Sequence, residues 1–259
     1  MTDPDSQNRY TAAMNGSASS PRFHLGIVTG LGFEADIARA AIGAAASSGS
    51  DTVTVACHGP GQARAHSAAG SLLDVGATAL LSFGVAGGCN PELPSGTVVL
   101  STGVRDIADG GQGELLYTNR EWQRRIKFRL LGTVLVEEAM IASAAVPVTG
   151  AADKRLLHAD LNAAAVDMES AAIAYAAIEA GVPFMALRAI LDTADTTLPP
   201  AALAGLGPDG DPQVSAVIRA LCRRPQDLAA LIRLGFANAK ARRALERAAA
   251  AAAPLFGAV

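Results

Sequence analysis

Short runs of β-branched or otherwise apolar residues alternate with longer alanine-rich segments along most of this chain. The alanine-rich segments, such as 34–47 and the one that follows residue 168, are typical of helices. Short strands that alternate with helices favour an α/β fold. We therefore predict three layers, with a mixed, twisted central sheet flanked by helices. The predicted strands are 24–30, 51–57, 78–84, 96–102, 163–168 and 184–190.

The two ends and one internal segment depart from this alternation. Residues 1–22 are polar and lack an apolar central region, which predicts a disordered leader and not a signal peptide. Residues 105–131 hold Tyr117, Trp122 and Phe128, and we interpret them as an excursion over the sheet that can serve as a lid. A basic C-terminal extension from about residue 213 is predicted to be helical, with breaks at its two prolines. We expect residues 23–259 to form a single domain.

Composition limits the classes of function. Half of the 259 residues are hydrophobic and 17% are charged, so the chain can bury a sizeable core. No apolar run approaches the roughly 18 residues needed to span a bilayer. The three cysteines, Cys57, Cys89 and Cys222, are widely separated, which predicts no metal site and favours a reducing cytoplasm.

Charge is unevenly distributed along the chain. From Gln213 onward there are eight basic and two acidic residues, a net +6, so the remainder of a chain with net charge −3 carries −9. This acidic body has no stripe of aromatic and basic residues, which argues against nucleic acid as a partner.

Three acids follow predicted strands: Glu34, Glu169 and Asp192. Ligands of open α/β sheets bind outside the carboxyl ends of the strands. Glu169 offers two acceptor oxygens that can hold neighbouring ribose hydroxyls, although an ordinary first-turn acid is the simpler alternative. Asp192 leaves an apolar strand, where desolvation would raise its pKa and let it act as a general acid. A capping role in the turn explains Asp192 equally well.

Two glycine-rich stretches are predicted to form turns at strand ends. Gly59 and Gly61 lie in one, and residues 84–88 form the other. Backbone amides exposed there can bind an anion, although ordinary βα turns explain the glycines equally well. Arg64 is a cation close to the first turn that could meet a phosphate.

Several of these stretches, in this order, resemble the nucleoside phosphorylase/nucleosidase superfamily. They are "GIVTGLGFEADI", "HGPGQARA", "TALLSFGVAGG", "GTVVLS", "AVDMESAAIAYAA" and "VPFMALRAILDTAD". The resemblance covers roughly residues 24–198, and "VDMES" with "RAILDTAD" is its specific part. The family includes purine nucleoside phosphorylases and methylthioadenosine/S-adenosylhomocysteine nucleosidases. The pattern is most similar to the hopanoid-associated branch, whose members remove adenine from adenosylhopane.

The resemblance implies a role for each matching residue. Glu169 would hold the ribose hydroxyls and Met168 would pack beneath the sugar. Asp192 would protonate purine N7, or hydrogen-bond to it, and Glu34 would activate water as in the nucleosidases. The other implied positions are Val166, Asp167 and Leu191 for the base, and Gly30, Val85, Ala86, Gly87 and Arg64 for an anion or water site.

The sequence also departs from the family pattern. Val85 and Leu191 replace serines that the family often has, and "TGAADK" (149–154) replaces "SGD" plus an aromatic, which leaves the base-stacking residue unassigned. Glu34 would repel phosphate, which favours water as nucleophile. The branch resemblance instead implies inorganic phosphate as co-substrate, with phosphoribohopane as product. We predict phosphorolysis of adenosylhopane, with no metal or organic cofactor.

Two alternatives stay open at this point. The chain could be a methylthioadenosine or S-adenosylhomocysteine nucleosidase. It could also be a non-catalytic nucleoside-binding module, because Val85 and Leu191 remove two hydroxyls from the site.

A lipid substrate would require a route to the bilayer. Leu228, Leu231, Ile232 and Phe236 fall near helical spacing, with Arg224, Arg233, Lys240 and Arg243 available to the other face. Such a helix can lie on an anionic membrane, although a solvated helix or a subunit contact is the alternative. The family resemblance implies a homo-oligomer. We expect a cytoplasmic protein that is peripheral on the inner membrane.

Overall fold

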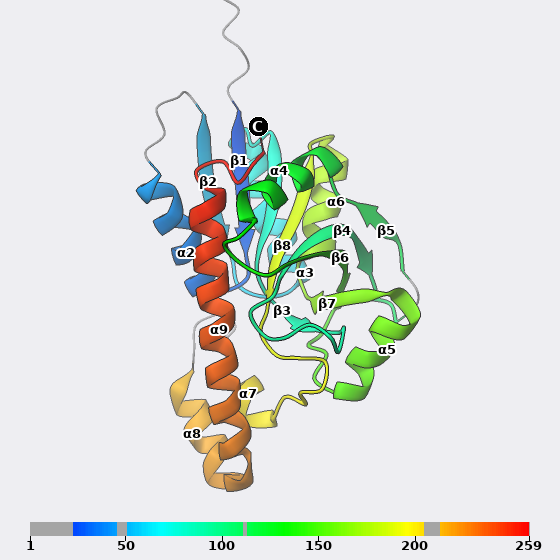
Figure 1. Ribbon diagram of the computed structural model, residues 1–259, viewed down its shortest axis with the longest axis vertical. Helices are drawn as coiled ribbons and strands as arrows, with labels where there is room; N and C mark the ends of the chain where they lie inside the picture. The colour runs from blue at the N-terminus through cyan, green and yellow to red at the C-terminus, as the bar shows by residue number, and fades with distance from the viewer. Residues whose placement is uncertain (1–22, 46–50, 111–112, 205–212, 259) are drawn as a thin grey trace, which may run out of the picture.

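The computed structural model describes residues 23–45, 51–110, 113–204 and 213–258 (Figure 1). The predicted leader, 1–22, lies outside the described residues. The strands are β1 (His24–Thr29), β2 (Thr52–Cys57), β3 (Ala79–Gly88), β4 (Val98–Asp106), β5 (Leu115–Tyr117), β6 (Val136–Ser143), β7 (Ala163–Asp167) and β8 (Phe184–Ile190). The helices are α2 (Gly32–Ala44), α3 (Gln62–Asp74), α4 (Arg120–Leu130), α5 (Ala151–Leu161), α6 (Ser170–Ala180), α7 (Pro200–Ala204), α8 (Val214–Arg223) and α9 (Leu228–Ala252), with a 3-10 turn at Pro225–Asp227.

The sheet is mixed and closes on itself at one side. β3 pairs with both β8 and β7, and β4 pairs with both β8 and β6. Because β6 also pairs with β7, these five strands form a ring. β1 and β2 extend from β3 in parallel, and β5 adds an antiparallel edge to β4.

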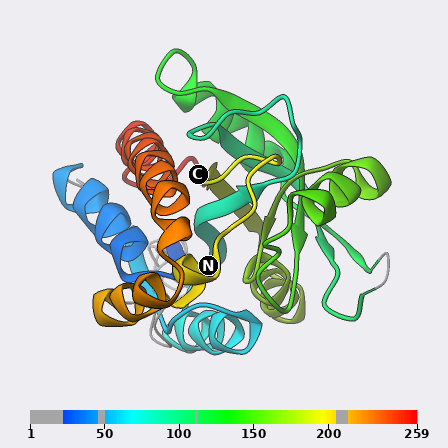
Figure 2. The same ribbon diagram turned by 90° about the horizontal axis from the view of Figure 1, so that it is seen from below.

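Helices cover both faces of the sheet, which confirms the predicted three-layer α/β fold. One core lies between the sheet and α2, α4 and α9, and it contains Leu81, Phe83 and Leu187. The other lies between the sheet and α3 and α6, and it contains Leu80 and Ala186. Figure 2 shows α2 beside α9, and α3 beside α6, as separate layers. Successive strand residues point to opposite cores because side chains alternate along a strand.

The described residues of 105–131 belong to the sheet and to one of its helices. They contain the end of β4, then β5 and α4. Trp122, Ile126 and Leu130 of α4 are buried in the core, and Trp122 Nε1 donates a hydrogen bond of 2.7 Å to the carbonyl of Phe256. α4 therefore anchors the C-terminal end of the chain, and the interpretation of 105–131 as a lid stays a prediction.

The glycine-rich stretch 84–88, predicted as a turn, is the second half of β3. A Cβ atom on Gly84 would lie 2.6 Å from Arg188 Nη1 and would also collide with the carboxylate of Glu34. Glycine is needed there because two buried side chains pack against the backbone of the strand.

The C-terminal extension is helical, with breaks beside Pro225 and Pro254. The second half of α9 is part of the core, through Ala241, Leu245 and Ala248. Within the described ranges, no helix has the length and apolar character needed to cross a membrane.

Candidate active site

A cavity of about 220 Å³ opens where β1, β3 and β8 end. Of the twelve residues proposed from the sequence, all except Arg64 line it: Gly30, Glu34, Val85, Ala86, Gly87, Val166, Asp167, Met168, Glu169, Leu191 and Asp192. Arg64 lies exposed on α3, and its guanidinium is 3.5 Å from the carbonyl of Pro60. Closure of the sheet explains the convergence, since β7 runs antiparallel to β3 and brings residues 166–169 back over the end of that strand.

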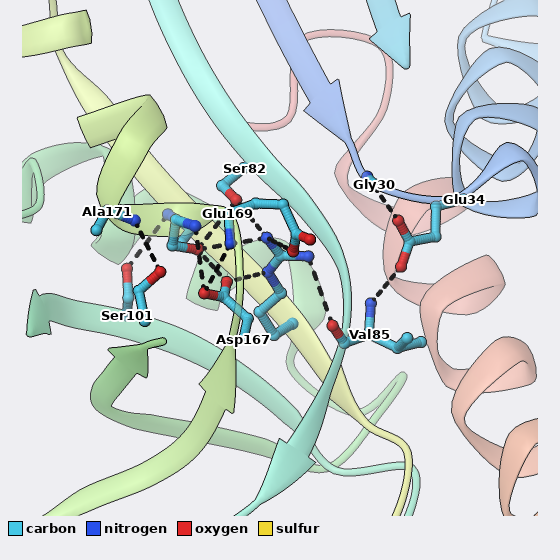
Figure 3. Close-up of polar contacts among 12 residues, drawn as sticks. Gly30, Glu34, Ser82, Val85, Ser101, Asp167, Glu169 and Ala171 are labelled. Atoms are coloured by element: carbon cyan, nitrogen blue, oxygen red, sulfur yellow. Dashed lines mark hydrogen bonds and ion pairs between the residues drawn. The ribbon is translucent and has the colours of Figure 1, made fainter. Parts of the chain in front are cut away.

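Glu34 is buried at the start of α2, and backbone amides surround its carboxylate. Oε2 accepts hydrogen bonds of 3.0 Å from the amides of Gly30 and Leu31, and Oε1 accepts one of 2.8 Å from Val85. Figure 3 shows Glu34 between Gly30, which follows β1, and Val85 in β3. The side chain therefore ties two neighbouring strands together at the floor of the cavity.

Burial raises the pKa of Glu34 to about 7, from an ordinary value of 4.5. The guanidinium of Arg188 and the amide of Val85 act in the opposite direction, while the nearby carboxylate of Glu169 adds to the increase. A carboxylate with this pKa can accept a proton near neutral pH, which suits a general base.

Glu169 lies between β7 and α6, and α6 begins one residue later, at Ser170. Its Oε1 accepts a hydrogen bond of 3.0 Å from the amide of Gly61, and its Oε2 is 3.4 Å from Arg188 Nη2. Gly61 can present this amide because it has a φ of +103°, a conformation that favours glycine. Burial raises the pKa of Glu169, and Arg188 opposes the increase.

Asp167 has a scaffolding contact in addition to its place at the cavity wall. Its Oδ2 is 2.8 Å from Arg188 Nε and also accepts a hydrogen bond from the hydroxyl of Ser170. Its Oδ1 accepts from the amides of Glu169 and Ser170. Both carboxylate oxygens are thus engaged, so the proposed contact of Asp167 with the base would have to come from its main chain.

Asp192 is buried beyond the end of β8 and forms an ion pair with Lys154 of α5. Its own carbonyl accepts a hydrogen bond of 2.7 Å from the amide of Gly88, which fixes the loop after β8 against β3. Burial raises the pKa of Asp192, and the ammonium of Lys154 acts in the opposite direction.

Sequence reasoning missed two buried cations of this site. The sequence contained a signal for Arg188, because an arginine inside the apolar strand "FMALRAI" needs acidic partners when it is buried. Lys154 gave no such signal, since its helix, α5, was not predicted and a helical lysine usually faces solvent. Among the described residues, no three His, Cys, Asp or Glu side chains are grouped so that they could hold a metal ion.

Comparison with known proteins places this geometry in a family. The sequence matches the profile of the phosphorylase superfamily over residues 25–223, well over half of the chain. The chain belongs to the phosphorylase superfamily. This confirms the superfamily predicted from the motifs, and with it an enzyme of the nucleoside phosphorylase/nucleosidase type. The hopanoid-associated branch stays a prediction. A search of curated proteins found no match.

Solved structures of similar fold include two from Helicobacter pylori. Futalosine hydrolase of strain 26695 has a TM-score of 0.59 and 22% identity, over 67% of this chain and 86% of its own. A 5′-methylthioadenosine/S-adenosylhomocysteine nucleosidase has a TM-score of 0.62 and 21% identity, over 68% and 88%. S-adenosylhomocysteine nucleosidase of Streptococcus pyogenes has a TM-score of 0.59 and 25% identity, over 68% and 86%.

Proposed function

We propose that this enzyme releases adenine from a 5′-substituted adenosine, with water as the nucleophile. The observation that carries the proposal is the carboxylate of Glu34, held by three backbone amides on the wall of a cavity that Glu169 and Asp192 also line. These three acids match the three tasks of N-ribosyl hydrolysis, which are activating water, holding the sugar and protonating the base.

The reaction breaks the bond between C1′ of the ribose and the purine, with the electron pair leaving on adenine. Asp192 supplies a proton to the purine, and general acid catalysis of this kind typically contributes about 10²- to 10⁴-fold. Glu169 holds the sugar hydroxyls and stabilises the positive charge that develops on the ring. Glu34 takes a proton from water as the water oxygen forms a bond to C1′.

Water fits the anion site better than phosphate does. The amides of Gly30 and Val85, which could otherwise bind a phosphate oxygen, already donate to Glu34. A phosphate would also approach the carboxylates of Glu34 and Glu169, and Arg64 does not line the cavity to offset that repulsion. The phosphate co-substrate expected from the branch resemblance has no comparable support from the geometry.

An apolar 5′ group fits the remaining wall of the cavity. Leu198, Ala202 and Leu234 line it from the segment before α7, from α7 and from α9, and Pro147 and Val148 add to the same surface. Adenosylhopane, the substrate implied by the branch resemblance, carries a large apolar group at this position. Methylthioadenosine is the alternative, because proteins of similar fold include methylthioadenosine nucleosidases.

Adenine release from the two nucleosides, with and without inorganic phosphate, tests this function. We expect the same rate of adenine release with and without phosphate. The sugar product should carry a hydroxyl at C1′ and no phosphate. A higher rate with adenosylhopane than with methylthioadenosine would support the large apolar substituent. Strict dependence on phosphate would contradict hydrolysis and restore the phosphorolytic prediction.

We further propose that the first half of α9 contacts an anionic membrane surface. Leu228, Ile232 and Phe236 are at least half exposed there, on the same helix as Leu234 of the cavity wall. Arg233 is exposed on this half of α9, and such a pairing of apolar and basic residues favours anionic lipid. The protein would then be peripheral to the membrane, and we expect a homo-oligomer from the family resemblance.

Sedimentation with anionic and neutral liposomes tests the membrane contact. We expect the double variant I232S/F236S to lose binding to anionic liposomes, while I178S, which changes an equally exposed side chain on α6, retains it. Point variants are needed because removal of the whole extension would expose the core that α9 covers. Equal sedimentation of I232S/F236S and the parent would exclude this surface.

A further inference from the structure

Lys154 is fully buried beside the cavity, although nothing in its sequence context predicts this. It lies in the first turn of α5, with 0% of its side chain exposed. Its ammonium forms an ion pair with Oδ2 of Asp192 and donates a hydrogen bond of 2.7 Å to the carbonyl of Thr196. The carbonyl of Thr193 is 3.5 Å away. The lysine is therefore held by the loop that carries Asp192.

A buried ion pair of this kind requires an explanation other than stability. The free energy lost when two charges are removed from water often exceeds the free energy gained from their attraction. An apolar pair of the same volume would therefore hold the loop as well. The pair also lies at the reaction site, because Asp192 lines the cavity. Oδ2 of Asp192 is engaged by Lys154, and Oδ1 is the oxygen closer to Gly87 of the cavity wall.

We propose that Lys154 is a positioning residue that orients Asp192 and resupplies its proton during catalysis. This inference rests on the proposed release of adenine. The bond from C1′ to the purine breaks with its electrons on adenine, and the purine nitrogen takes the proton of Asp192 Oδ1. Lys154 then transfers one ammonium proton to Oδ2, so Asp192 is neutral again and Lys154 is a neutral amine. Water restores the lysine proton after the products leave.

Few other charged groups face this pair. Cys89, which follows β3, is buried near both side chains, and burial raises the pKa of its thiol to about 12, so it stays neutral. Asp195 and Arg233 line a neighbouring hollow of about 390 Å³ that reaches Asp192 from the α9 side. Asp195 pairs at 3.2 Å with Arg155, and both are exposed to solvent. Among the described residues, Lys154 is thus the cation in direct contact with Asp192.

Substitution of Lys154 should change the alkaline limb of the pH profile of kcat/KM. With Lys154 present, the ammonium in contact with Oδ2 can supply a second proton after Asp192 has released its own. In K154M, Asp192 alone holds the proton, so kcat/KM should begin to fall at lower pH than in the parent. K154R keeps the positive charge but cannot give up a proton, so it should not restore the rate. R155M, which removes the exposed cation next in sequence, is the control and should match the parent.

A binding measurement separates this inference from the proposed function. Adenine binding is measured by calorimetry from pH 6 to pH 10 on the parent, K154M and R155M proteins. We expect adenine affinity to decline at lower pH in K154M than in the other two. An unchanged pH dependence in folded K154M, or full activity in K154R, overturns the role of Lys154. Absence of adenine release from every nucleoside, with the shift in binding retained, would overturn only the proposed hydrolysis.

Discussion

Replacing Asp192 by asparagine is expected to lower kcat/KM for adenine release by about 10²- to 10⁴-fold. Asparagine keeps the size of the side chain but has no carboxyl proton to give to the purine. The substitution also leaves the buried ammonium of Lys154 without its carboxylate, which typically destabilises a protein by about 3–5 kcal/mol. The rate should therefore be measured well below the melting temperature of the variant.

Two further variants separate chemistry from stability. D195N changes an acid three residues further along that is exposed, and it should match the parent. D192N/K154M removes both members of the buried pair, so it should recover part of the lost stability without recovering the rate. Folded D192N with turnover within about threefold of the parent would contradict a general acid at this position.

Loss of the Glu34 carboxylate should have an effect of similar size and should change the acid limb of the pH profile. As a general base Glu34 must be ionised, and burial raises its pKa to about 7. In the parent, kcat/KM should therefore rise as pH increases through 7. In E34Q the rate should fall by about 10²- to 10⁴-fold and this rise should disappear. D36N, an exposed acid of the same helix, provides the control.

The raised pKa of Glu34 also makes the free energy of unfolding depend on pH. The folded protein binds the Glu34 proton more tightly than the unfolded chain does, because the pKa is about 7 instead of 4.5. The contribution of Glu34 to the free energy of unfolding therefore decreases between about pH 4.5 and pH 7. Denaturant titrations of the parent and D36N should show this decrease. A decrease of equal size in E34Q would assign the dependence to other groups.

Alternation of apolar strands with alanine-rich helices was sufficient to predict the layers of this fold. β6 was missed because Glu137 and Glu138 interrupt its apolar pattern, and β5 because it is only three residues long. The closed ring of strands also had no local signal, since it depends on β8 pairing with both β3 and β4. Pairing of that kind is set by the packing of the whole chain and not by any one segment.

The candidate site was predicted residue by residue, but its internal contacts were not. Motif resemblance identified Glu34, Glu169 and Asp192 as lining residues, and all three border one cavity. It placed Gly30 and Val85 at an anion or water site but did not predict that their amides donate to the chain's own Glu34. Side chains that satisfy one another across the fold, as Lys154 and Asp192 do, are separated by 38 residues and leave no pattern in the sequence.

The division of α9 into two halves has a consequence for how specificity can diverge in this enzyme. Its carboxyl-terminal half is locked into the interior through Ala241, Leu245 and Ala248, while Leu234 in its other half borders the cavity. Changes at the outer half can therefore reshape the substrate chamber without loosening the scaffold. New nucleoside preferences could then arise from a few substitutions on one helix, with the acids proposed to perform the chemistry left untouched.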